Sequence, residues 1–191
     1  MTLNRFLIIA CTTAALASGA GATSAAAASA TAGPASVPVT GTVVTFCTTG
    51  TLTNDTTVFD LGVLTDPNTG LLKNNIAPVS KILNGATCNT VSTITVAASP
   101  MTAQDFTTVP PAGFARAIDY TATASGWTTT PAVYVTSQSS NSAANQARNT
   151  PFSGQITLTL SSFTTTGGSN LLLVSDPVYS GAITVTLAAG N

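Results

Sequence analysis

The chain contains no histidine and no glutamate, and charged residues of any kind are rare. Its 191 residues include five Lys or Arg and six acidic residues, all of them aspartate. Without histidine, a catalytic triad would need an unusual base, and a carboxylate pair would have to come from scattered aspartates. The net charge of −1 provides no basic surface for nucleic acid. We therefore expect neither an enzyme nor a nucleic-acid-binding protein, and we expect no cofactor.

No apolar run is long enough to cross a membrane as a helix, which takes about 20 residues. The N-terminal sequence "MTLNRFLIIACTTAALASGAGA" has one Arg, then a short apolar stretch, then small residues. This order is typical of a secretory signal peptide. Cleavage after Ala22 would remove residues 1–22, and cleavage after Ala28 or Ala30 fits the same pattern. We expect an exported protein whose mature chain does not span a membrane.

Cysteine is scarce, and only Cys47 and Cys88 remain once the signal peptide is removed. Two thiols in an exported chain most simply form one disulfide. Closing this loop is worth ~4 kcal/mol in the chain-entropy model. Neither a CxxC spacing nor a histidine indicates a redox or metal role, so we expect a structural disulfide.

Three further features have both a structural and a functional interpretation. The turn "DPNTG" (66–70) has oxygen ligands spaced as in a weak calcium loop, but such turns are mostly only turns, so we expect no metal. Trp127 could stack on a carbohydrate, although a single Trp is more often a core residue or loop anchor. Asp119 is expected to face solvent beside Arg116 or to anchor a turn.

Most of the mature chain consists of short segments of alternating polarity that are separated by Gly, Pro and Asn. This alternation predicts half-buried strands. In the last of them, Ile183, Val185 and Leu187 fall on one face, which we expect to pack on the core. The polar stretch 137–151 is expected to be a loop with one helical turn near 143–147. The expected strands cover residues 56–64, 78–84, 91–98, 115–124, 131–137, 154–161, 171–174 and 179–189.

Many short strands at this spacing predict an all-β fold, namely an immunoglobulin-like β-sandwich. One further alternating segment, "VPVTGTVVTFC" (37–47), precedes the first cysteine of the mature chain. Pro34 and Pro38 each remove a main-chain donor from this region, and proline is disfavoured inside sheets. The residues of one face of the segment are Ala35, Val37, Val39, Gly41 and Val43.

The order of four features resembles chaperone–usher pilus subunits, including type 1 and P pilus rods and spore coat U-like archaic pilins. These features are "GTVV" followed by a cysteine, then "VFDLGVLTD", then "VSKILNGATC" with the second cysteine, and the C-terminal "YSGAITVTLAAGN". The resemblance covers most of residues 37–98 and 179–191. It implies a sandwich that lacks its final strand and is completed by a strand donated from another subunit.

The resemblance also implies partners and a location. A periplasmic chaperone fills the groove first, an outer-membrane usher assembles the subunits, and the N-terminal extension of another subunit then replaces the chaperone. On this interpretation, residues 23–43 are a donor strand, and its inward residues are the five that share a face. Residues 44–191 are the pilin-like domain of a fimbrium with a role in adhesion or biofilm. Its last strand, with Ile183, Val185 and Leu187, would meet the chaperone.

The alternative is a self-sufficient protein. Residues 37–46 would then be the first strand of a closed sandwich, and the protein would be a free-standing secreted or cell-surface binding or coat protein. The position of this segment in the structure therefore bears on both interpretations.

Overall fold

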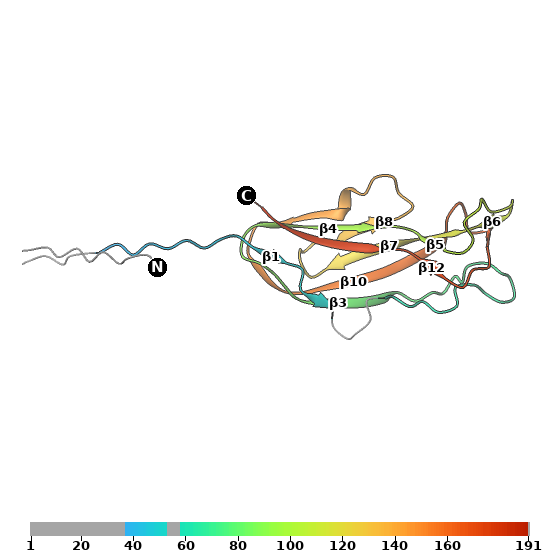
Figure 1. The fold of residues 1–191 in the computed structure, drawn as a ribbon, viewed down its shortest axis with the longest axis horizontal. Helices are drawn as coiled ribbons and strands as arrows, with labels where there is room; N and C mark the ends of the chain where they lie inside the picture. The colour runs from blue at the N-terminus through green and yellow to red at the C-terminus, as the bar shows by residue number, and fades with distance from the viewer. Residues whose placement is uncertain (1–36, 53–57, 191) are drawn as a thin grey trace, which may run out of the picture. The chain divides into compact units, whose positions relative to one another are not determined.

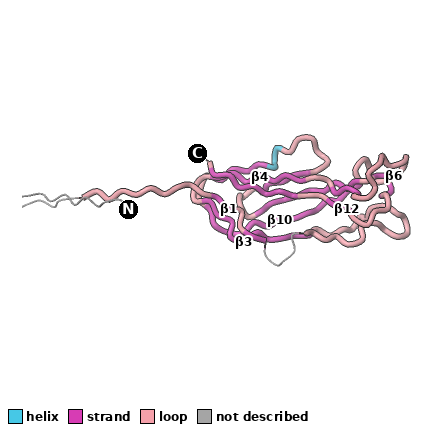
Figure 2. Tube along the Cα trace, viewed as in Figure 1, coloured by secondary structure: helices cyan, strands magenta, loops and turns pink. Residues whose placement is uncertain are grey.

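The computed structural model describes residues 37–52 and 58–190. The predicted signal peptide, its alternative cleavage positions and Ala35 lie outside the described residues. The chain divides into two units, Met1–Gly41 and Thr42–Asn191, and all the strands belong to the second. The described residues form strands and one 3₁₀ turn, η1 (Ser142–Ala144), without an α-helix (Figure 2). The prediction of an all-β fold is confirmed.

The larger sheet is antiparallel, in the order β1-β3-β10-β7-β5-β12, with β2 also paired to β3 and β8 to β7. Its strands are β1 (Cys47–Thr48), β2 (Thr51–Leu52), β3 (Val79–Cys88), β5 (Met101–Ala103), β7 (Ala117–Ser125), β8 (Ala132–Val135), β10 (Phe152–Thr165) and β12 (Tyr179–Ser180).

This sheet is strongly curled into a half-barrel, and two irregularities in the pairing of β10 contribute to the curl. Between Gly154 and Ile156 the register shifts against β3, where Gly85 has a φ of +75°. A second shift against β7 occurs next to Ser162, which has a φ of 54°. An extra residue on one strand bends it and increases its local twist.

A smaller antiparallel sheet has the order β13-β4-β9, formed by β13 (Ile183–Ala189), β4 (Ser92–Ala98) and β9 (Asn145–Arg148). The two sheets enclose one core (Figure 1). Ile94 of β4 and Ile156 of β10 are fully buried in this core together with Trp127. Trp127 is thus a core residue, and stacking on a carbohydrate would require it to be exposed. A short parallel pair, β6 (Phe114–Ala115) and β11 (Leu172–Leu173), lies at the end of the unit away from β1.

The strand expected at 179–189 is divided in two. Tyr179–Ser180 pairs with β5 of the larger sheet, whereas Ile183–Ala189 pairs with β4 of the smaller one. Gly181 lies at the crossing, and a Cβ there would come within 2.8 Å of the Ser99 carbonyl oxygen. The chain therefore changes sheets at a position that only glycine fits without adjustment.

Two segments differ from what the sequence predicts. Residues 145–148, expected within a loop with a helical turn, form strand β9, and the turn is η1 just before it. No strand forms in the described part of 56–64, because the Asp60 side chain accepts a hydrogen bond from the Gly62 N–H at 2.9 Å and Gly62 has a φ of +63°. This local turn interrupts the extended backbone. For Asp119, the expected exposure to solvent beside Arg116 is wrong, whereas the alternative of a turn anchor is confirmed, because Thr136 and Thr166 lie in turns. Asp119 is buried and anchors neighbouring segments through Thr136 and Thr166, while Arg116 donates to the Thr107 carbonyl oxygen.

Candidate functional site

The last strand, β13, is the edge of the smaller sheet, and β4 is its only strand partner among the described residues. Its residues Ile183, Val185 and Leu187 are half-buried and pack against the core, while the residues between them are exposed. An edge strand with an apolar inner face can accept a further strand, and proteins usually protect such edges.

The main-chain groups of β13 can be assigned to its two sides from the bonds at its ends. The Ala182 carbonyl oxygen accepts from the Ser99 N–H at 2.9 Å, and the Gly190 N–H donates to the Val91 carbonyl oxygen at 2.7 Å. The N–H and C=O groups of the even-numbered residues therefore point toward β4. Because successive residues of a strand point their N–H and C=O groups to opposite sides, those of Ile183, Val185 and Leu187 point toward the free edge.

Beside this edge lies a cavity of about 450 Å³, which we call the inter-sheet cavity. Ile183 and Val185 line one wall, Leu52 and Leu83 of β2 and β3 contribute to the other, and Tyr120 is buried at its base. Burial raises the pKa of Tyr120 to about 12, so its hydroxyl stays protonated and donates to the Ala182 carbonyl oxygen at 3.3 Å. The cavity is thus bounded by both sheets and by the chain crossing between them.

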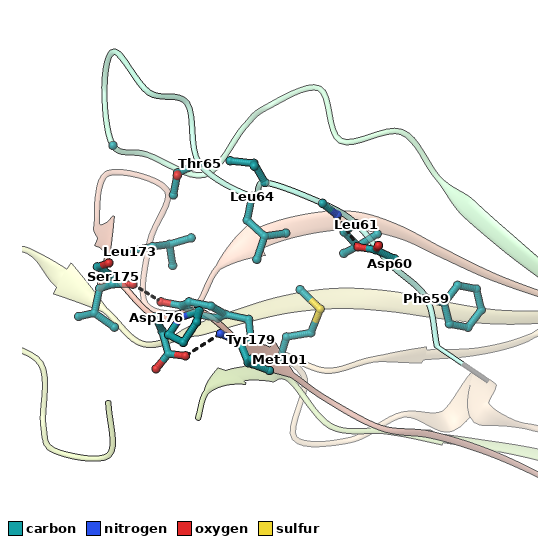
Figure 3. A pocket seen from close by; sticks show the side chains of 16 residues that line it. Phe59, Asp60, Leu61, Leu64, Thr65, Met101, Leu173, Ser175, Asp176 and Tyr179 are labelled. Carbon is teal, nitrogen blue, oxygen red and sulfur yellow. Dashed lines mark hydrogen bonds between the residues drawn. The ribbon is translucent and has the colours of Figure 1, made fainter. Parts of the chain in front are cut away.

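A second cavity of about 610 Å³, which we call the end cavity, shares Phe59, Met101 and Tyr179 with the first. It lies between residues 59–65 and residues 173–179. Figure 3 shows Leu61 and Leu64 on one side of it, with Tyr179 and Met101 across from them. The two cavities adjoin at the three residues that they share, and together they extend from beside β13 to beyond Tyr179, with a lining that is more apolar than polar. We call the two together the groove.

Asp176 fixes the far wall of the end cavity. Its carboxylate accepts hydrogen bonds from the N–H groups of Asp105, Phe106 and Val178 at 2.8–2.9 Å. Desolvation acts to raise the pKa of Asp176, but these backbone donors outweigh it and lower the pKa below its usual value. Burial raises the pKa of Tyr179, and the nearby Asp176 charge adds to the effect. The Tyr179 hydroxyl donates to the Val174 carbonyl oxygen at 2.8 Å.

The opposite edge of the smaller sheet is closed by side chains. The Arg148 guanidinium of β9 lies 4.5 Å from the centre of the Phe152 ring on β10 and donates to the Trp127 carbonyl oxygen at 2.6 Å. Phe152 in turn packs edge-on against Trp127, with ring centres 4.6 Å apart. The space between the sheets is therefore sealed at β9 and accessible at β13.

The predicted donor residues Val37, Val39, Gly41 and Val43 lie in a segment without a strand, because residues 37–46 have no β-pairing. The three valines are 82%, 96% and 86% exposed, respectively. Residues 37–41 belong to the first unit and residues 42–46 to the second, so the alternative that this segment closes its own sheet stays a prediction. Ala35, the fifth predicted donor residue, lies outside the described residues.

The predicted disulfide between Cys47 and Cys88 is present and joins β1 to β3. Next to it, Asn89 binds the chain that leads into β1. Its side chain accepts from the Phe46 N–H at 2.9 Å and donates to the Val44 carbonyl oxygen at 2.8 Å, and its own N–H donates to the Phe46 carbonyl oxygen at 3.2 Å. We call this arrangement the Asn89 clamp.

Sequence reasoning identified β13 but missed the other residues of the groove. Tyr120 could have been found, because it alternates with Ala122 and Ala124 on the buried face of β7. Asn89 carried no comparable signal, because it belongs to no periodic segment. Phe59 lies in the segment 56–64, whose pattern predicted a strand and gave no indication of a cavity.

The described residues hold no group of three or more His, Cys, Asp or Glu side chains that could bind a metal ion. In the turn at 66–70, Asp66 instead accepts from the Asn68 N–H at 2.8 Å. Within the described part of the chain, no helix has the length and apolar character needed to span a membrane. Comparison with protein-family models, with curated proteins and with solved structures found no match to this chain.

Proposed function

We propose that this protein is a structural subunit of a bacterial surface pilus, assembled by donor-strand exchange. Its domain is an immunoglobulin-like sandwich that lacks one strand, and residues 35–43 of another copy supply it. The observation that carries the proposal is the unpaired edge of β13 beside the two adjoining cavities of the groove. Strand addition would satisfy this edge, and alternate side chains would fill the groove.

The direction of the donated strand follows from the two sides of β13. In an antiparallel pair, opposed residues share a face and point their main-chain groups either toward or away from each other. Ile183, Val185 and Leu187 point inward with their side chains and toward the free edge with their N–H and C=O groups. An antiparallel donor therefore bonds to β13 through its inward, odd-numbered residues, none of which is proline.

The prolines argue against the parallel arrangement. In a parallel pair, the donor residue that lies opposite Ile183, Val185 or Leu187 points its own N–H and C=O groups away from β13. The donor would then bond through its even-numbered residues, and Pro34 and Pro38 would each lack the required N–H. The antiparallel donor instead turns both prolines away from β13, so that neither is required to donate a hydrogen bond to that strand.

The proposal implies the route of export. A subunit with an open apolar groove needs a periplasmic chaperone until another copy fills the groove, and an outer-membrane usher for assembly at the cell surface. Donation from copy to copy is head-to-tail and does not close, so it gives a fibre.

The test compares two single substitutions in the full mature chain. Val39→Asp would place a charge in the groove, whereas Thr40→Asp places the same charge on the outward face of the same strand. We expect Thr40→Asp to form fibres visible by electron microscopy and Val39→Asp to form none. A synthetic peptide of residues 33–44, "GPASVPVTGTVV", should raise the melting temperature of the Val39→Asp chain, and the rise should grow with peptide concentration.

Equal behaviour of the two variants, or a wild-type chain that is a stable monomer without any chaperone, would contradict donation. A stable monomer would favour the free-standing binding or coat protein.

A further inference from the structure

The Asn89 clamp determines where the N-terminal segment can leave its own domain. Its hydrogen bonds hold Val44 and Phe46 against the turn that follows β3. Val43 is therefore the last residue before the clamp that is free to enter a neighbouring groove. Consecutive Cα atoms are about 3.8 Å apart, so no flexible linker separates a donated Val43 from the donor's own domain.

The antiparallel direction of the donated strand then determines which end of the acceptor domain lies next to the donor's own domain. An antiparallel donor places its C-terminal residue, Val43, near the first residue of β13, Ile183. Tyr179 and the end cavity lie directly beyond this point. The Asn89 clamp of the donor copy must accordingly contact the end cavity of the acceptor copy.

We propose that the end cavity is a docking site for the clamp of the incoming copy, with Val44 and Phe46 covering it, so that the junction between subunits is rigid. This inference rests on the proposed function. The occupant is a second copy of this chain, because only the residues that follow a donated strand are held at this place. Asn89 is a positioning residue, since it touches the acceptor only through the residues that it holds.

The two surfaces suit each other in polarity. Val44 and Phe46 are 76% and 50% exposed, and on the acceptor Val63 and Val178 are 70% and 51% exposed beside the end cavity. Residues 44–46 carry no charge, so they bring no like charge toward Asp60 and Asp176 of the cavity wall. Docking would remove exposed apolar surface from water on both copies.

A cross-linking experiment on assembled full-length fibres tests the contact. In the variant V44C/V178C, mild oxidation after assembly should join successive copies, and electrophoresis without reductant should show a ladder that collapses to monomer with reductant. The control V44C/S139C has its second cysteine on the exposed loop after β8 and should give no ladder. A ladder in both variants, or in neither, overturns the proposed contact.

A second measurement tests rigidity. Asn89→Ala should still give fibres, because the donor strand is unchanged, but their persistence length in electron micrographs should fall at least twofold. Asn74→Ala, at an exposed position away from the clamp, should leave it unchanged. Fibres of equal stiffness would overturn the role of Asn89 while leaving strand donation standing. If the wild-type chain forms no fibres, donation fails and the docking inference fails with it.

Discussion

Among single residues, Asp119 contributes most visibly to holding separate segments together. Its buried carboxylate accepts from the Thr136 hydroxyl at 2.8 Å through one oxygen and from the Thr166 hydroxyl at 2.7 Å through the other. The Thr136 hydroxyl oxygen also accepts from the Tyr120 N–H at 2.9 Å. One carboxylate therefore links β7 to the residues after β8 and after β10, next to the tyrosine at the base of the inter-sheet cavity.

Removing this carboxylate should be costly. Asp119→Ala would remove the acceptor of the half-buried Thr136 hydroxyl and of the exposed Thr166 hydroxyl, and we expect the free energy of unfolding to fall by about 1–3 kcal/mol. The measurement is chemical denaturation of the mature chain. Asp105→Ala provides the control, because that side chain is exposed and only its main-chain N–H is used. Similar losses in the two variants would show that the network around Asp119 contributes little.

At the scale of elements, β13 contributes to the fold through one face only. Val185 packs on the core and lines the inter-sheet cavity, whereas its neighbour Thr184 is exposed. Val185→Asp should lower the free energy of unfolding by about 2–4 kcal/mol, because it brings an unpaired charge into apolar surroundings. Thr184→Asp should change it by less than about 0.5 kcal/mol. Equal melting temperatures for the two variants would mean that the inner face is misassigned.

The elements also show how far the sequence alone could lead. Alternation located the strands around Ile94, Ile156 and Val185 and their inward faces, because period two is a local property. It failed at residues 58–64, where the contact between Asp60 and Gly62 interrupts an apolar segment that otherwise looks like a strand. Alternation cannot identify the neighbour of a strand, so neither the open edge of β13 nor the cavities beside it could be predicted from the residues.

At the scale of the whole molecule, the domain is sealed on one side and open on the other. The cluster of Arg148, Phe152 and Trp127 closes the space between the sheets at β9. At β13 no strand among the described residues pairs with the free edge. The disulfide and the Asn89 clamp hold residues 44–47 at the end of this unit opposite β6.

This asymmetry leads to a prediction about polarity in the fibre. The chain with Val39→Asp cannot donate its own segment, but its groove is intact, so it should bind the peptide of residues 33–44. A nitroxide label at the C-terminus of the peptide should broaden the amide resonance of Ile183 and spare that of Leu187, because the antiparallel strand ends beside the start of β13. A label at the N-terminus should give the reverse.

The physical reason lies in the spacing of the two prolines. Pro34 and Pro38 are separated by four residues and so point to the same side of a strand. Only the antiparallel arrangement turns that side away from β13, so that every residue of the donated strand that faces Ile183, Val185 and Leu187 keeps its N–H group. Broadening of Leu187 by the C-terminal label would mean a parallel strand that loses two hydrogen bonds to β13. The groove itself, and not the main-chain pairing, would then have to determine the direction of assembly.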